Sequence, residues 1–244
     1  MPTQVSTQEM FIETYCPISA DKISFTRQQG SNFAKQVADD FNPLHNIDAK
    51  RFCVPGDLLF SIVIAKSGLH KNMTFDFSGM VGDNVSLTFP QAIDSHFDIK
   101  DDNDKTCLSV SVSGESTHNP NIINLLTKAY VDFSGQTFPE ILVKLMSENS
   151  VMINPARPMI MYQSMSIDLH TFDAESVTLK LAKTSLSIDG KRGDALLEFD
   201  LLSNDEVIGH GKKHMLLSGL RSYEQEVIDT MVNQYRESKK NYKV

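Results

Sequence analysis

The sequence predicts an α+β fold built from two repeats, each with one buried helix followed by an antiparallel sheet. Three observations predict it. The segment 56–69 is apolar and long enough for a buried helix, alternating apolar and polar residues follow it from Met73 onward, and the same order returns after residue 136. With 244 residues and 41% apolar content, the chain can build a substantial core.

The first half is predicted to begin with a strand near 10–16 and a helix capped by Thr26. In F-T-R-Q-Q-G-S-N-F-A-K-Q-V-A-D-D, the hydroxyl of Thr26 precedes apolar residues spaced by four, starting at Phe33. Pro43 disfavours helical geometry at the residue before it. Residues 40–45, D-F-N-P-L-H, should therefore form the turn that leaves this helix.

The central helix of the first half is predicted at 56–69, G-D-L-L-F-S-I-V-I-A-K-S-G-L, where Gly68 suits a helix C-terminus. Glycine and aspartate turn signals at 82–83 and 101–104 separate the runs that follow it. The predicted strands lie at 74–78, 84–89, 96–100, 107–113 and 128–135. Together they make an antiparallel sheet that follows the helix.

The second half is predicted to repeat this order with little sequence identity. Its helix is expected at 137–152 and its strands at 160–169, 176–187, 195–202 and 207–217. Setting Ser134-Gly135 over Ser218-Gly219 shifts the chain by 84 residues and carries the central helix onto 140–153. Agreement of two features on one offset is what a duplicated unit predicts.

Three parts of the chain follow from this pattern. The first repeat is predicted at 1–135, a second and degenerate repeat at 136–221, and a C-terminal helix with a tail at 222–244. In the last part, Val227, Met231 and Tyr235 are spaced for one apolar helix face.

Composition narrows the function. The net charge of −8, from 31 acidic and 23 basic residues, argues against a nucleic-acid partner for the main body. The first residues lack a basic and an apolar region, and no stretch approaches the ~20 apolar residues of a membrane helix, so we expect no membrane association and a cytoplasmic location. Cys16, Cys53 and Cys107 show no CxxC spacing and the histidines no HExxH arrangement, so neither a metal nor a cofactor is expected.

The order of helix, D-x-N-P-x-H turn, buried helix and curling sheet resembles the MaoC-like hotdog superfamily, which includes the (R)-specific enoyl-CoA hydratases. The likeness is closest over 25–45 and at M-V-G-D-N-V-S-L, residues 80–87, and it covers about the first 135 residues at motif level. The second half resembles a hotdog only by its layout. The resemblance implies a double hotdog, each repeat a sheet wrapped around a central helix, within a separate bacterial family of that superfamily.

The resemblance also implies a site and a chemistry. In the hydratases, the acid and the histidine of the motif activate water for addition across a trans-2-enoyl thioester, giving an (R)-3-hydroxyacyl product. Carried over, Asp40 and His45 are the catalytic pair, while Asn42 fixes the turn at the substrate and the Gly56 N–H faces the thioester carbonyl. The implied partner is a thioester of CoA or of acyl carrier protein, and a homodimer of double hotdogs is compatible with the family.

That chemistry suits these residue types. Hydration of a conjugated thioester needs a base for the water, a proton donor for the α-carbon and hydrogen-bond donors at the carbonyl oxygen. We therefore expect one pocket per chain at the seam between the repeats, with Asp40 and His45 facing it. We also expect the helix near 139–152 to run beside the central helix.

A non-catalytic hotdog module for ligand binding or interaction remains the alternative. Active hydratases commonly have His-Gly where this chain has Val54-Pro55-Gly56-Asp57. Pro55 has no N–H to donate, and Asp57 puts a negative side chain near the developing enolate. In that alternative, Asp40 only accepts hydrogen bonds in its own turn and His45 is a buried structural histidine.

Overall fold

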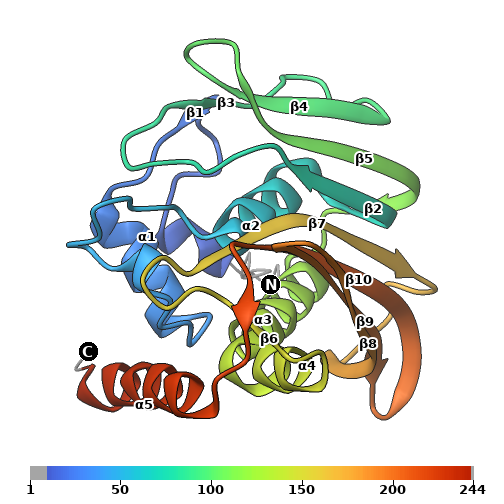
Figure 1. Ribbon diagram of the computed structural model, residues 1–244. Helices are drawn as coiled ribbons and strands as arrows, with labels where there is room; N and C mark the ends of the chain where they lie inside the picture. The colour runs from blue at the N-terminus through green and yellow to red at the C-terminus, as the bar shows by residue number, and fades with distance from the viewer. Residues whose placement is uncertain (1–9, 243–244) are drawn as a thin grey trace, which may run out of the picture.

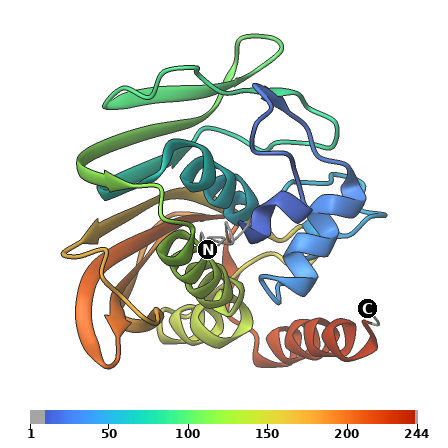
Figure 2. The same cartoon turned by 180° about the vertical axis from the view of Figure 1, so that it is seen from behind.

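The computed structural model describes residues 10–242 and is built around a nine-stranded antiparallel sheet that curls about two helices (Figures 1 and 2). The first nine residues, whose composition argued against a signal peptide, lie outside the described range. The helices are α1 Arg27–Gln36, α2 Gly56–Ser67, α3 Pro120–Gly135, α4 Leu142–Glu148 and α5 Gln225–Asn241, with short turns η1 Phe11–Thr14, η2 Pro43–His45 and η3 Thr137–Ile141. The α+β class and the large antiparallel sheet are confirmed.

The strands of the large sheet lie in the order β1-β3-β4-β5-β2-β7-β10-β9-β8. Their bounds are β1 Lys22–Ile23, β2 Leu69–Phe77, β3 Leu87–Thr88, β4 His96–Asp101, β5 Thr106–Thr117, β7 Met159–Leu169, β8 Thr178–Asp189, β9 Arg192–Ser203 and β10 Glu206–Ser218. A separate small sheet pairs β6 Val151–Met152 with β11 Arg221–Ser222.

The two halves of the large sheet have the same strand order. In the first half, α2 is followed by strands arranged β3-β4-β5-β2, and in the second half α3 is followed by strands arranged β8-β9-β10-β7. Within the large sheet, the first strand after each helix lies innermost, and β2 pairs with β7 antiparallel, from Asn72 opposite Asp168 to Asp76 opposite Ser164. The chain therefore repeats in topology, with its two halves joined at the centre of one sheet.

The sequence explains these elements locally. Thr26 and Gln29 form a reciprocal capping box at the start of α1. Helix α2 is buried along nearly its whole length, because the curled sheet and α3 both cover it, and it ends at Gly68 with φ +83°. In β9, and in β10 from Gly209 onward, every second residue is buried, as a sheet with one face on the core requires.

Two predicted strands and the predicted neighbour of the central helix are wrong, although α4 does lie within the helix expected at 137–152. Residues 128–135 form the second half of α3 instead of a strand, and α3 instead of a helix at 139–152 lies beside α2. The start signal was Asn119, whose side chain caps the helix, followed by Pro120 at its first position. The predicted strand near 10–16 is also wrong, since η1 occupies that place.

The 84-residue shift does not relate equivalent positions, although the topology repeats. Gly135 ends α3, where an added Cβ would lie 1.5 Å from the carbonyl oxygen of Ala38. Gly219 follows β10 with φ +71° and no atom within 4 Å of such a Cβ. One glycine permits a close backbone approach and the other a left-handed turn, so their likeness in sequence had unrelated causes.

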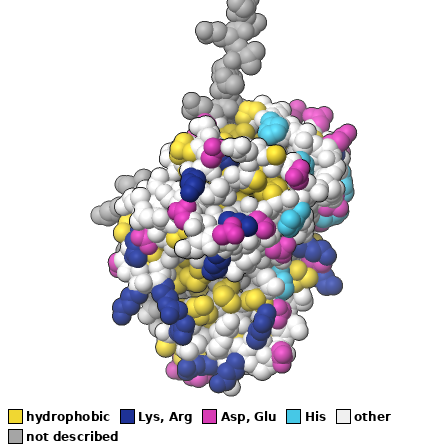
Figure 3. Space-filling view, turned by 90° about the horizontal axis from the view of Figure 1, so that it is seen from above, with side chains coloured by type: hydrophobic (Ala, Val, Ile, Leu, Met, Phe, Trp, Pro, Cys, Tyr) yellow, Lys and Arg dark blue, Asp and Glu magenta, His cyan; other side chains and the backbone are white. Residues whose placement is uncertain are grey.

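No helix within residues 10–242 is long and apolar enough to cross a membrane. Acidic and basic side chains share the face of the molecule that Figure 3 presents, with apolar side chains between them. That face therefore carries no field of a single sign.

Candidate functional site

A cavity of about 1030 Å³ lies between the two halves. Its walls come from the 40–45 turn and the start of α2 in the first half, and from the end of α3, η3, β7 and β10 in the second. Helix α5 closes one side. The volume is at the upper end of the range for small-molecule sites.

The 40–45 turn is held by two successive side-chain-to-backbone hydrogen bonds. The Asp40 Oδ1 atom accepts from the Asn42 backbone N–H at 2.8 Å, and the Asn42 Oδ1 atom accepts from the Leu44 N–H at 3.0 Å. Pro43 then begins the short η2 turn. These bonds fix the direction in which the second oxygen of Asp40 and the ring of His45 point.

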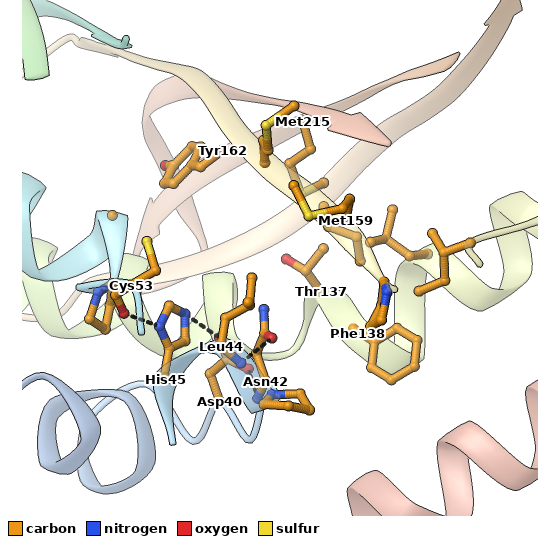
Figure 4. A pocket seen from close by; sticks show the side chains of 18 of the residues that line it. Asp40, Asn42, Leu44, His45, Cys53, Thr137, Phe138, Met159, Tyr162 and Met215 are labelled. Carbon is orange, nitrogen blue, oxygen red and sulfur yellow. Dashed lines mark hydrogen bonds and ion pairs between the residues drawn. The ribbon is translucent and has the colours of Figure 1, made fainter. Parts of the chain in front are cut away.

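Asp40 and His45 face each other inside the cavity (Figure 4). His45 Nδ1 lies 2.7 Å from the carbonyl oxygen of Cys53, so this nitrogen carries a proton, because a carbonyl can only accept. His45 Nε2 lies 3.7 Å from Asp40 Oδ2. Asp40 thus holds its own turn with one carboxylate oxygen and points the other toward His45.

Gly56 lines the same cavity, but Tyr162 covers it. An added Cβ at Gly56 would lie 2.6 Å from the Cδ1 atom of Tyr162, whose ring stacks on Phe77 with centroids 4.4 Å apart. All four residues implied by the family resemblance thus border one cavity. Their roles stay predictions.

A second polar group on the cavity wall was missed by sequence reasoning. Ser134 Oγ donates to Asp57 Oδ2 at 2.6 Å, and Lys213 Nζ donates to Ser134 Oγ at 2.5 Å and to Thr137 Oγ1 at 3.3 Å. Lys213 and Ser134 are each 5% exposed and Asp57 is 8% exposed. The first half supplies the acid, and the second half supplies the hydroxyls and the base.

Burial and pairing shift the pKa values of Asp57 and Lys213 in opposite directions. Burial raises the pKa of Asp57, while the Lys213 ammonium and the Ser134 hydroxyl lower it. Burial lowers the pKa of Lys213, while the Asp57 carboxylate, and more weakly Asp40, raise it. The pair and the Asp40–His45 pair therefore share one electrostatic environment.

The sequence did contain a signal for Lys213. In the alternating run of β10, Met215 and Leu217 face the core, so Lys213 falls in the same inward register. A lysine at an inward strand position needs a buried partner. That the partner is Asp57, 156 positions earlier in the chain, follows only from the fold.

The remaining cavity wall is largely apolar. Its apolar side chains include Phe138, Leu142, Ile153, Met159, Met215 and Met231. Cys53 also borders the cavity, where burial raises the pKa of its thiol to about 11. The site thus combines two polar groups with room for an apolar chain.

Fold and site together define an α+β protein with one large, mixed polar and apolar cavity between two topologically matching halves. Residues 10–226 match the family described as "Protein of unknown function (DUF3581)", and the chain belongs to that family. No curated protein matches the chain.

Several solved structures are similar at low scores. A putative thioesterase II from Thermobifida fusca YX has a TM-score of 0.48 at 6% identity, covering 87% of this chain and 99% of that one. A tesB protein from Mycobacterium avium subs paratuberculosis has a TM-score of 0.45 at 10% identity, covering 69% and 89%. The acyl-CoA thioesterase II TesB2 from Mycobacterium marinum has a TM-score of 0.43 at 11% identity, covering 70% and 90%. At such scores the likeness decides neither architecture nor activity.

Proposed function

We propose that the chain is a double hotdog that binds an acyl thioester, carried by CoA or by acyl carrier protein, in the cavity between its halves. The observation that carries the proposal is the single cavity to which Asp40, Asn42, His45 and Gly56 all contribute. The matching strand order of the halves supports the double hotdog, with the second unit beginning at α3. The apolar wall suits an acyl chain and the two polar groups suit its thioester end.

The chemistry we propose is hydration of a trans-2-enoyl thioester at Asp40 and His45. Asp40 Oδ2 takes one proton from water as the water oxygen bonds to the β-carbon, while His45 Nε2, an acceptor because Nδ1 holds the ring proton, accepts a hydrogen bond from the other O–H of the same water. Asp40 then passes the proton it took to the α-carbon, so that the added hydroxyl and the added hydrogen come from one water. The product is the (R)-3-hydroxyacyl thioester. The 3.7 Å between Asp40 Oδ2 and His45 Nε2 leaves both groups within reach of one water molecule.

The alternative is a non-catalytic module that binds thioesters without converting them. The position of Tyr162 against Gly56 favours it, because the tyrosine ring occupies space beside the backbone group expected at the carbonyl. The negative charge of Asp57, in contrast, argues less against catalysis than the sequence suggested. Its Oδ2 is bound by Ser134 and its charge is opposed by Lys213.

Two measurements on the purified chain test these proposals. In thermal unfolding, a 2-enoyl-CoA at 100 times its dissociation constant should add ~2.7 kcal/mol to stability, while free CoA adds less. The intact chain should also remove the enoyl absorbance over time. The rate of this loss should be lower by ~100-fold or more in Asp40→Asn and in His45→Gln. Thiol release, followed in parallel, distinguishes hydrolysis of the thioester from hydration.

The outcomes separate the readings. Stabilisation with no absorbance change at any chain length supports the binding module. Turnover that is unchanged in Asp40→Asn and His45→Gln would contradict the catalytic role proposed for these two residues. If no acyl-CoA stabilises the chain, the proposal of thioester binding is contradicted.

A further inference from the structure

Lys213 occupies a position where the core needs no charge. It lies in the inward register of β10 with Met215 and is 5% exposed. Burying an ammonium and a carboxylate costs several kcal/mol each, and apolar residues of similar volume serve a core equally well or better. A buried pair that borders a cavity therefore calls for a role beyond packing.

The ammonium of Lys213 is held in place on three sides. Two of its N–H groups bind Ser134 Oγ and Thr137 Oγ1. The ring of Tyr162 lies with its centroid 4.8 Å from Nζ. An ammonium has three N–H donors, and within residues 10–242 the hydroxyls satisfy two, which leaves a donor at a group that borders the cavity.

Asp57 provides the matching acceptor. Its Oδ2 atom accepts from Ser134, while its buried Oδ1 atom has no hydrogen-bond partner among the described residues. Leaving a charged acceptor unpaired in a buried site costs more than a single hydrogen bond returns. The group thus borders the cavity with one spare N–H donor on Lys213 and keeps a buried carboxylate behind it, while the Asp40–His45 pair borders the same cavity from the first half.

A thioester ligand fits this arrangement. We propose that Lys213 donates its remaining N–H to the thioester carbonyl oxygen, with Ser134, Thr137 and Asp57 as positioning residues. The inference rests on the proposed function, from which it takes the ligand. It assigns to a side chain of the second half the carbonyl contact that the family resemblance gave to Gly56, which Tyr162 covers.

The chemistry favours such a contact. As water adds to the β-carbon, negative charge builds on the carbonyl oxygen, and a cation already in position stabilises it without reorganisation. The Ser134 hydroxyl lies between the two charges, since it accepts from the Lys213 ammonium and donates to the Asp57 carboxylate.

The test compares two probes that differ only at the carbonyl: dodecanoyl-CoA and S-dodecyl-CoA, in which a methylene replaces the carbonyl. Calorimetry on the intact chain should give dodecanoyl-CoA a dissociation constant lower by about 10-fold or more, the effect of a charge-assisted hydrogen bond. In Lys213→Met, and in Lys213→Met with Asp57→Asn, which leaves no unpaired buried charge, the preference should disappear. The matched control is Lys212→Met, since Lys212 faces outward and pairs with Glu198.

A spectroscopic measurement accompanies the binding data. The infrared carbonyl stretch of dodecanoyl-CoA labelled with ¹³C at the carbonyl should lie lower when bound to the intact chain than when bound to the double variant, because a donor weakens the C=O bond. Binding of both probes with equal affinity, or a preference and a stretch unchanged in the Lys213 variants, would overturn the inference and leave the proposed function standing. Where neither dodecyl probe binds, the pair is made at the chain length that stabilises the chain most in thermal unfolding; absence of stabilisation by every acyl-CoA would instead overturn the proposed function, and this inference with it.

Discussion

At the scale of single residues, Asp57 and Lys213 are buried charges of opposite sign that Ser134 connects in the cavity wall. Lys213→Met leaves the Asp57 carboxylate buried without its cation, and we expect the free energy of unfolding at pH 7 to fall by about 3–5 kcal/mol. The double variant with Asp57→Asn should recover most of this loss, since it carries no buried charge. Urea unfolding of both variants measures the difference, and a double variant no more stable than Lys213→Met would contradict the pairing.

The same pair predicts how the loss depends on pH. Burial raises the pKa of Asp57 above its ordinary 3.8 and Lys213 lowers it, so removal of Lys213 raises that pKa further. A carboxyl with a raised folded-state pKa contributes stability that is present below pH 3.8 and is lost as the pH rises through the folded-state value. Relative to the double variant, Lys213→Met should therefore become less stable as pH increases.

At the scale of elements, α5 is fastened to the 40–45 turn by Tyr235. The Tyr235 hydroxyl accepts from the Phe41 backbone N–H at 3.1 Å, and its ring packs edge-on against Phe41 and Phe138. Tyr235→Phe keeps the ring and leaves a buried N–H unpaired, which should cost about 1–3 kcal/mol in urea unfolding. Tyr242→Phe is the matched control, because among residues 10–242 its hydroxyl accepts from the exposed Gln36 side chain alone, and its loss should cost little. Equal effects of the two substitutions would argue against the contact.

Elements with a long, clear period could be predicted from the sequence. Alternation placed β4, β5 and β7–β10, and the capping residue placed α1. The segment 128–135 could not be placed, because K-A-Y-V-D-F alternates over six residues as readily as it continues a helix. Only its start at Asn119-Pro120, eight residues upstream, distinguishes the two.

At the scale of the whole molecule, the pairing of β2 with β7 makes one folding unit of the two halves. A fragment of residues 1–118 would leave the β2 edge unpaired and expose Phe60, which packs on Tyr130 of α3 with ring centroids 4.6 Å apart. We expect the fragment to lack a cooperative transition. The intact chain should unfold in one step, with circular dichroism and tyrosine fluorescence coinciding, since it contains no tryptophan. Two separate transitions would contradict a shared core.

Only the part of the candidate site that lies within one short segment could be predicted from the sequence. Asp40, Asn42 and His45 lie within six residues, so a turn and a motif sufficed to bring them together. Asp57, Ser134 and Lys213 meet only because α2, α3 and β10 converge at the cavity. No local pattern records such a meeting, which is why half of the polar wall was missed.

The glycine that ends α3 has a mechanical consequence. Because an added Cβ at Gly135 would lie 1.5 Å from the Ala38 carbonyl oxygen, main chain presses on main chain there, with no deformable side chain between. The end of α3, which carries Ser134, therefore lies directly against the segment that leads into Asp40. A side chain at position 135 would push these two segments apart, and we expect Gly135→Ala to widen the distance between the two polar walls of the cavity.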